Sequence, residues 1–163
     1  MAVHASQKRE TRVDYLNKIQ FFLIEVNDFI KEQENYDHDI ILKYLLDMII
    51  RAYLNATDAS YIKIANISTY HEKLKLCLKA RALFKTIVDY LEIVWASHSE
   101  TLSEKQFIRW CELIGEINTK IKKNNEKDLA ILKRLLGKKI QDAEITKLMI
   151  DFEKQVYEPD VTS

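Results

Sequence analysis

The strongest constraint on the fold is a helix signature between Thr101 and Ile121. Ser103 can accept hydrogen bonds from the free N–H groups of a first helical turn, and Gln106, three residues later, can reach back to complete a capping box. Beyond this cap, apolar side chains recur at steps of three and four and make one stripe: Phe107, Trp110, Ile114, Ile117 and Ile121. Because such a stripe must be covered, we expect other amphipathic helices to pack against it.

Three earlier segments have the same helical periodicity. The first spans residues 12–34, with apolar side chains spaced as in bundled helices. The second spans residues 39–54 and has an apolar face wider than one stripe, which indicates contacts on two sides, in the bundle or in an oligomer. A run of cap-forming residues, 55–60, follows it and is expected to form a turn. The third helix is expected over residues 69–96, with Ser60 or Thr69 as its cap.

The scarcity of turn-forming residues determines the fold class. The chain of 163 residues contains two glycines and one proline, fewer than sheets and loop-built active sites usually need. The sequence therefore predicts an all-α protein, an antiparallel four-helix bundle over residues 11–123 with short loops. Residues 1–10 are expected to form a flexible arm. After a polar break, residues 124–163 are expected to form a helical extension, with a stop at Gly137, and a disordered tail.

Several kinds of protein are disfavoured by what the sequence lacks. There is no run of eighteen apolar residues and no signal peptide, so we expect no membrane segment. Cys77 and Cys111 form no CxxC pair, which is typical of buried free thiols in a reducing cytoplasm. No histidine follows a glutamate by three residues, and the run 37–39 (DHD) suits a helix cap. Without phosphate-loop or nucleophile motifs, we expect no metal, no cofactor and no enzymatic activity.

Charge is unevenly distributed, although the formal net charge is zero. Residues 25–58 carry eight acids and three bases. In contrast, residues 59–88 carry six bases and one acid, and residues 118–139 carry eight bases and two acids. A short turn joins the last two helices, so their basic segments should meet at one end of the bundle. This arrangement would create a positive pole that could bind phosphates.

The candidate nucleic-acid-binding residues belong to this pole. They come from the third and fourth expected helices: Lys73, Lys75, Lys79, Arg81, Lys85, Lys120, Lys122 and Lys123. The alternative interpretation is that the lysines only solvate exposed faces and interact favourably with a helix C-terminus. Under that interpretation, Arg81 extends past the core to water.

Three stretches of the chain carry a resemblance to a known family. Leu42–Ala56, Lys73–Val94 and Leu102–Ile121 are similar to the second, third and fourth helices of the accessory variability determinant proteins of diversity-generating retroelements, which are small four-helix bundles. The similarity covers residues 12–123 and includes Gly115, where the family has a glycine near an acidic residue. A glycine inside a helix costs about 1 kcal/mol relative to alanine, so we expect another backbone to pack closely there.

The resemblance implies a function without chemistry. Proteins of this family form ring-like pentamers that associate with the retroelement reverse transcriptase and with template RNA or DNA, and they support mutagenic retrohoming. For this chain, the resemblance implies a cytoplasmic, non-enzymatic homo-oligomer, suggested to be a pentamer, with the same partners. One alternative is an oligomeric helical scaffold or regulator that binds only protein. Another is an enzyme whose site matches no known motif.

Overall fold

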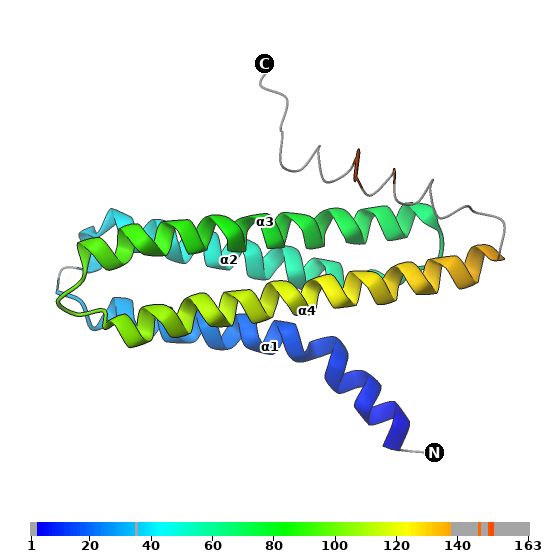
Figure 1. Cartoon of the computed structure of the whole chain (residues 1–163), viewed down its shortest axis with the longest axis horizontal. Helices are drawn as coiled ribbons and strands as arrows, with labels where there is room; N and C mark the ends of the chain where they lie inside the picture. The colour runs from blue at the N-terminus through cyan, green and yellow to red at the C-terminus, as the bar shows by residue number, and fades with distance from the viewer. Residues whose placement is uncertain (1–2, 35, 138–146, 148–149, 152–163) are drawn as a thin grey trace.

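The computed structural model describes residues 3–34, 36–137, 147 and 150–151. The helices within these residues are α1 (Val3–Lys31), the short 3-10 helix η1 (Tyr36–His38), α2 (Ile40–Tyr61), α3 (Ile67–Ser97) and α4 (Glu104–Leu136). The described residues contain no strand, so the predicted all-α fold class is confirmed. The four long helices lie alongside one another (Figure 1), and α1 and α3 each pack against both α2 and α4.

Two helix starts agree with the capping residues expected from the sequence. Asp39 caps α2, and its carboxylate accepts from the Leu42 N–H at 3.0 Å. Ser103 caps α4, and its hydroxyl accepts from the Gln106 N–H at 3.2 Å. Each side chain satisfies an N–H group that has no partner within the helix.

Two boundaries around the α2–α3 turn differ from the prediction. α2 continues through residues 55–60, where a turn was expected, because Ala56 and Ala59 are buried and continue its apolar face. α3 is capped by Asn66, whose side chain accepts from the Thr69 N–H, while the Thr69 hydroxyl accepts from the Asn66 N–H. Both caps proposed for this helix are therefore wrong, and Thr69 is the reciprocal member of the capping box.

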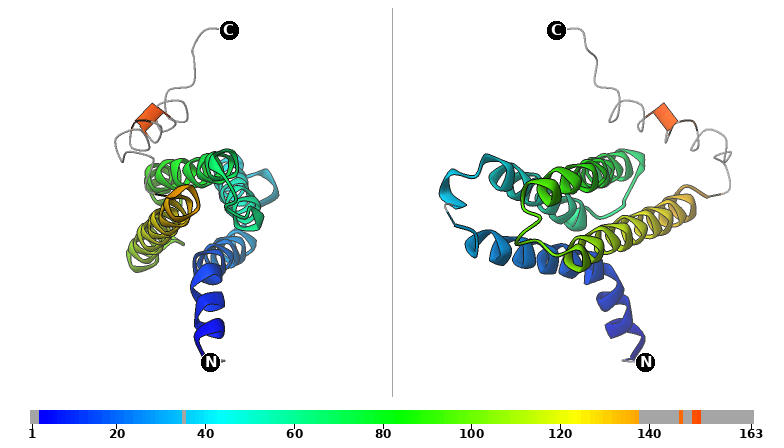
Figure 2. Two further views of the ribbon diagram at one scale, coloured as in Figure 1. Left: turned by 90° about the vertical axis from the view of Figure 1, so that its right-hand side faces the viewer. Right: turned by 60° about the vertical axis from the view of Figure 1, so that its left-hand side comes forward.

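The two ends of the bundle also differ from the prediction. α1 begins at Val3, before the expected start at residue 12, and its first turns extend away from the other helices (Figures 1 and 2). α4 continues to Leu136, so the predicted polar break after Ile121 is wrong. Gly137 follows α4 with φ 67°, a conformation that glycine adopts easily, and the predicted helix stop is confirmed. The expected amphipathic stretch and disordered tail beyond it lie outside the described residues.

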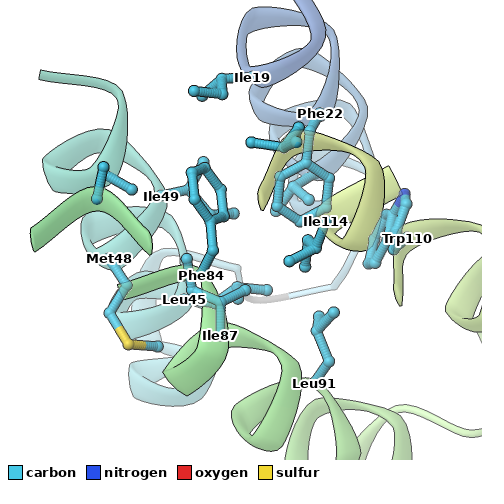
Figure 3. Close-up of a cluster of buried hydrophobic side chains, with 14 of the residues drawn as sticks. Ile19, Phe22, Leu45, Met48, Ile49, Phe84, Ile87, Leu91, Trp110 and Ile114 are labelled. Atoms are coloured by element: carbon cyan, nitrogen blue, oxygen red, sulfur yellow. The ribbon is translucent and has the colours of Figure 1, made fainter. Parts of the chain in front are cut away.

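Apolar side chains form two separate clusters. The larger cluster fills the space between the four helices (Figure 3). At its centre the rings of Phe22 and Phe29 meet Trp110 edge to face, with centroids 6.0 and 5.6 Å away. Trp95 stacks on Phe107 at 5.0 Å between α3 and α4. The smaller cluster lies between the start of α3 and the end of α4 and consists of Tyr70, Leu74, Leu78 and Leu132.

Three ion pairs connect α1 to α4. They are Asp14–Lys120, Lys18–Glu116 and Glu25–Arg109. The indole N–H of Trp110 also donates to Glu25, at 3.2 Å. These pairs are partly exposed, so each stabilises the fold little on its own, but together they define which residues of the two helices face each other.

Candidate nucleic-acid interface

The two basic segments lie side by side at one end of the bundle. α3 and α4 leave their connecting turn together and extend to the other end of the molecule (Figure 1). There the Lys73 ammonium lies 2.7 Å from the Asp128 carboxylate. The predicted meeting of the two basic segments is therefore confirmed. We call the part formed by the first half of α3 and the second half of α4 the basic end.

Four of the predicted residues are exposed at the basic end and form no ion pair with the described residues: Lys75, Lys79, Lys122 and Lys123. We refer to them as the four exposed lysines. Lys75 and Lys79 are one turn apart on α3. Lys79 lies six positions after Lys73 on α3, and Lys122 lies six positions before Asp128 on α4. Because Lys73 contacts Asp128, Lys79 and Lys122 are at the same level of the bundle.

The other predicted residues have different environments. Lys73 is 2% exposed and is bound to Asp128, so it is not accessible to a phosphate in this structure. Lys120 is paired with Asp14 across the α1–α4 contact. Lys85 is exposed, whereas Arg81 is half-buried and its Nε atom is buried. Lys73 and Lys120 therefore do not belong to the free positive surface.

Two exposed basic residues near the end of α4 were missed by the assignment of site residues. Lys127 and Arg134 lie in the helix beyond Lys123. Lys127 belongs to the segment that was predicted to be a polar break, and Arg134 to the helical extension expected after it. The useful signal was the periodic placement of Leu129 and Leu132, which continues the helical spacing through this segment. With α4 extended in this way, the basic end includes more cations than the sequence assigned.

Six polar side chains on α3 and α4 at the basic end are buried or half-buried. We call this set the polar layer, and it consists of Lys73, Arg81, Asn118, Asn124, Asn125 and Asp128. Asp128 accepts from both Lys73, at 2.7 Å, and the Asn124 amide, at 3.3 Å. These contacts compensate the desolvation of its carboxylate, which is 6% exposed.

Burial determines the protonation state of the groups beside the polar layer. It raises the pKa of the Cys77 thiol to about 12, with the Lys73 ammonium opposing the shift only in part. Burial, followed by the negative charge of Asp128, also raises the pKa of Tyr70 to about 12. Cys77 is therefore a protonated, unreactive thiol at neutral pH, and it is buried and free as predicted.

The opposite end of the bundle presents acids and aromatic side chains. The Asp39 carboxylate caps α2, and it also lies 2.7 Å from Nε2 of the His98 ring. Tyr44 contacts Tyr90 edge to face at 5.2 Å, and Ile40 is 80% exposed. Because Asp39 is occupied by these contacts, the run 37–39 acts as a cap. Within residues 3–34 and 36–137, no three ligating side chains gather in a way that could hold a metal ion.

Gly115 does not have the close packing that the sequence led us to expect. A Cβ atom at this position would have no atom within 4 Å, and the residue is exposed on α4. The expectation of a closely packed backbone there is therefore wrong for the single chain.

None of the helices in the described part of the chain is both long and apolar enough to cross a lipid bilayer. Comparisons of this chain with family models, with curated proteins and with solved structures found no match.

Proposed function

We propose that this protein is a non-enzymatic accessory protein that binds RNA or DNA through its basic end. The observation that carries the proposal is the placement of the four exposed lysines. They lie on the two helices that meet at the Lys73–Asp128 contact, and none of them forms an ion pair with a carboxylate of the described residues. By contrast, the basic residues facing α1 from α4 each have an acidic partner, as in the Lys120–Asp14 pair.

The chemistry of the four exposed lysines suits the phosphate backbone rather than the bases. Ammonium groups on flexible stems neutralise phosphates as point charges and release condensed counterions, which gives affinity without sequence readout. Tyr70 and His71, the rings in the turn before Lys75 on α3, are buried and half-buried and do not offer an open surface on which bases could stack. The proposed binding is therefore sensitive to salt and has little dependence on sequence.

The resemblance to accessory variability determinant proteins supports a specific partner for this activity. We propose that the protein binds the reverse transcriptase of a diversity-generating retroelement together with its template RNA or DNA during mutagenic retrohoming. A pull-down with the reverse transcriptase encoded beside this gene, with and without nuclease, tests this partner. Retention after nuclease treatment supports a direct protein contact. The absence of a reverse-transcriptase gene nearby, or no retention in either condition, contradicts it.

We also propose that the four helices form an antiparallel bundle. Support comes from the three α1–α4 ion pairs, in which residue numbers rise along α1 while they fall along α4: Asp14–Lys120, Lys18–Glu116 and Glu25–Arg109. The α3–α4 contacts Trp95–Phe107 and Lys73–Asp128 follow the same order. Distances between spin labels at the two ends of α1 and α4 would test this arrangement.

The experiment that tests nucleic-acid binding removes the four exposed lysines together. Replacing all four with glutamine should lower the affinity for a single-stranded RNA oligonucleotide about tenfold or more at low salt, because four phosphate contacts are lost. Lys120 is left unchanged because it holds Asp14 and contributes to the fold. The control is the double variant Lys31→Glu and Lys105→Glu, two exposed lysines elsewhere on the surface. Both variants change the net charge by −4, so equal losses of affinity would contradict a specific basic end.

A second candidate function is an oligomeric scaffold that binds only protein. It is favoured by exposed apolar side chains on α2, where Leu54 is 53% and Tyr61 81% exposed. The same face supports the proposed homo-oligomer, for which the resemblance suggests a pentamer. Light scattering at micromolar concentration measures the oligomer mass, and a monomeric mass contradicts the oligomer. An oligomer that fails to bind any oligonucleotide favours the scaffold.

A further inference from the structure

The polar layer carries one more positive than negative side chain. Lys73 and Arg81 are its cations, and Asp128 is its only acid. Asp128 is bound to Lys73 at 2.7 Å, and the described residues place no carboxylate within ion-pairing distance of Arg81. Arg81 is half-buried, and its Nε–H is buried without a hydrogen-bond acceptor in the part of the chain that the structure describes. A buried guanidinium N–H without an acceptor carries a desolvation penalty, which a bound anion would relieve.

The position of Arg81 relative to α4 follows from two flanking contacts. Trp95 stacks on Phe107, and Lys73 pairs with Asp128, so the two helices keep the same register over the whole interval. Arg81 lies eight residues after Lys73 on α3. On α4, the position eight residues before Asp128 falls in the turn that contains residues 118–122. At 1.5 Å per residue on both helices, Arg81 is therefore level with that turn.

Two side chains of this turn lie on the edge of α4 that faces α3. Phe107 marks this edge, because its ring stacks on Trp95 of α3. Asn118 follows Phe107 by eleven residues, close to three full turns, and returns to the same edge, and Lys122 lies one turn further along α4. The Oδ1 atom of Asn118 is buried and has no hydrogen-bond partner in the described residues, like the Nε atom of Arg81.

We infer that Arg81, Asn118 and Lys122 form a binding site for one phosphate group, which supplies the anion that the polar layer lacks. The guanidinium offers a planar fork of donors, the exposed Lys122 adds a second positive charge, and the Asn118 amide adds a polar group that can be turned to donate. The phosphate comes from the backbone of RNA or DNA, in which case the site rests on the proposed function, or from a free phosphate compound.

The first test measures thermal unfolding of the full chain in inorganic phosphate and in sodium chloride at equal ionic strength. Phosphate should raise the Tm of the wild type by about 3 °C more than chloride does, with saturation, because it binds the folded state only. Arg81→Gln should abolish this difference. Lys63→Gln, which removes an exposed lysine between α2 and α3, should retain it. A wild type that responds equally to the two salts would overturn the site.

Two further variants decide the case if Arg81→Gln does not fold. Asn118→Asp is nearly isosteric and places a carboxylate beside Arg81, so it should raise the Tm without phosphate and remove the phosphate response. Arg81→Lys keeps the charge but loses the fork, so the phosphate response should weaken while the fold is retained. A phosphate response as large as that of the wild type in both variants would show that Arg81 and Asn118 do not bind the anion.

The source of the phosphate is separated by measuring RNA affinity on the same variants. If Arg81→Gln lowers RNA affinity more than Lys63→Gln does, the site binds the RNA backbone. If Arg81→Gln loses the phosphate response but binds RNA as tightly as the control variant does, the site binds a free phosphate compound. Failure of the proposed function can be told apart from failure of this site. A protein that binds no RNA but has an Arg81-dependent phosphate response would contradict the proposed function and support the site. The reverse result, RNA binding without any phosphate response, removes the site and leaves the proposed function.

Discussion

The two halves of the α3–α4 contact use different chemistry. Near the α3–α4 turn the contact is apolar, with Trp95 stacked on Phe107 and Trp110 fully buried. At the basic end the polar layer, with the Lys73–Asp128 pair at its centre, lies beside the smaller apolar cluster. The apolar half supplies most of the burial that stabilises the bundle. The polar half stabilises it less but holds α3 and α4 in one register, and its outer surface carries the four exposed lysines.

The largest effect is expected in the apolar half. Trp110 is fully buried, contacts Phe22 and Phe29, and donates its indole N–H to Glu25. Trp110→Ala should therefore lower the free energy of unfolding by about 4 kcal/mol, through lost burial and the cavity left behind. Urea unfolding followed by circular dichroism measures this change. A loss below about 1 kcal/mol would show that this half does not dominate the stability.

In the polar half, the expected result depends on whether one or both partners are replaced. Asp128→Leu leaves the Lys73 ammonium buried without its partner and should cost about 3 kcal/mol. The double variant Lys73→Met and Asp128→Leu removes both charges and should recover most of the loss. The same unfolding experiment on the two single variants and the double variant gives the coupling between them. Additive losses would mean that the two charges do not act as a pair.

The contrast also explains which parts of the structure could be predicted from the sequence. The caps at Asp39 and Ser103 and the stripe through Trp110 were predictable because their signals are local, within one or two turns. The continuation of α4 beyond Ile121 was not predictable, because Asn125 and Asp128 occupy core positions and give the segment the composition of a loop. Lys73 has the sequence context of a surface lysine. Only its distant partner Asp128 makes it a buried residue.

The candidate site was predictable only in part for the same reason. Exposure of Lys75 and Lys79 follows from their position off the apolar stripe of α3. The structure confirms the meeting of the two basic segments, but it removes Lys120 through its contact with Asp14, a residue of another helix. Lys127 was missed because it lies beyond the supposed end of the helix. Pairing between distant segments, rather than local pattern, decides which cations are free.

A smaller effect is expected at Asp39, at the end of the bundle opposite to the basic end, where it depends on pH. Burial alone would raise the pKa of Asp39, but hydrogen bonds from the Leu42 N–H and His98, with the positive charge of His98, outweigh it, so the pKa is lowered. The contribution of Asp39 to stability is therefore present above about pH 4 and is lost as the pH falls through its folded pKa. Asp39→Ala should cost about 1 kcal/mol at pH 6 and progressively less below pH 4. A cost that is independent of pH would contradict a charged cap.

The smallest effect is expected at Gly115, on the exposed side of the apolar half. Because a Cβ atom there has no neighbour within 4 Å, Gly115→Ala should raise the free energy of unfolding by about 1 kcal/mol, through helix propensity. Thermal unfolding measures this gain. Light scattering of Gly115→Leu is the companion measurement. A reduced oligomer mass would place Gly115 in a close contact between copies, whereas an unchanged mass agrees with an exposed position.

The central claim, that the outer surface of the polar half binds phosphates, is tested most directly by the salt dependence of RNA binding. Affinity for a single-stranded RNA oligonucleotide is measured over a salt series for the wild type and for the variant with all four exposed lysines changed to glutamine. Each lost phosphate contact lowers the slope of log affinity against log salt, so the slope should decrease by up to about 3. Equal slopes and equal affinities would show that these lysines only solvate the surface, and would contradict the account.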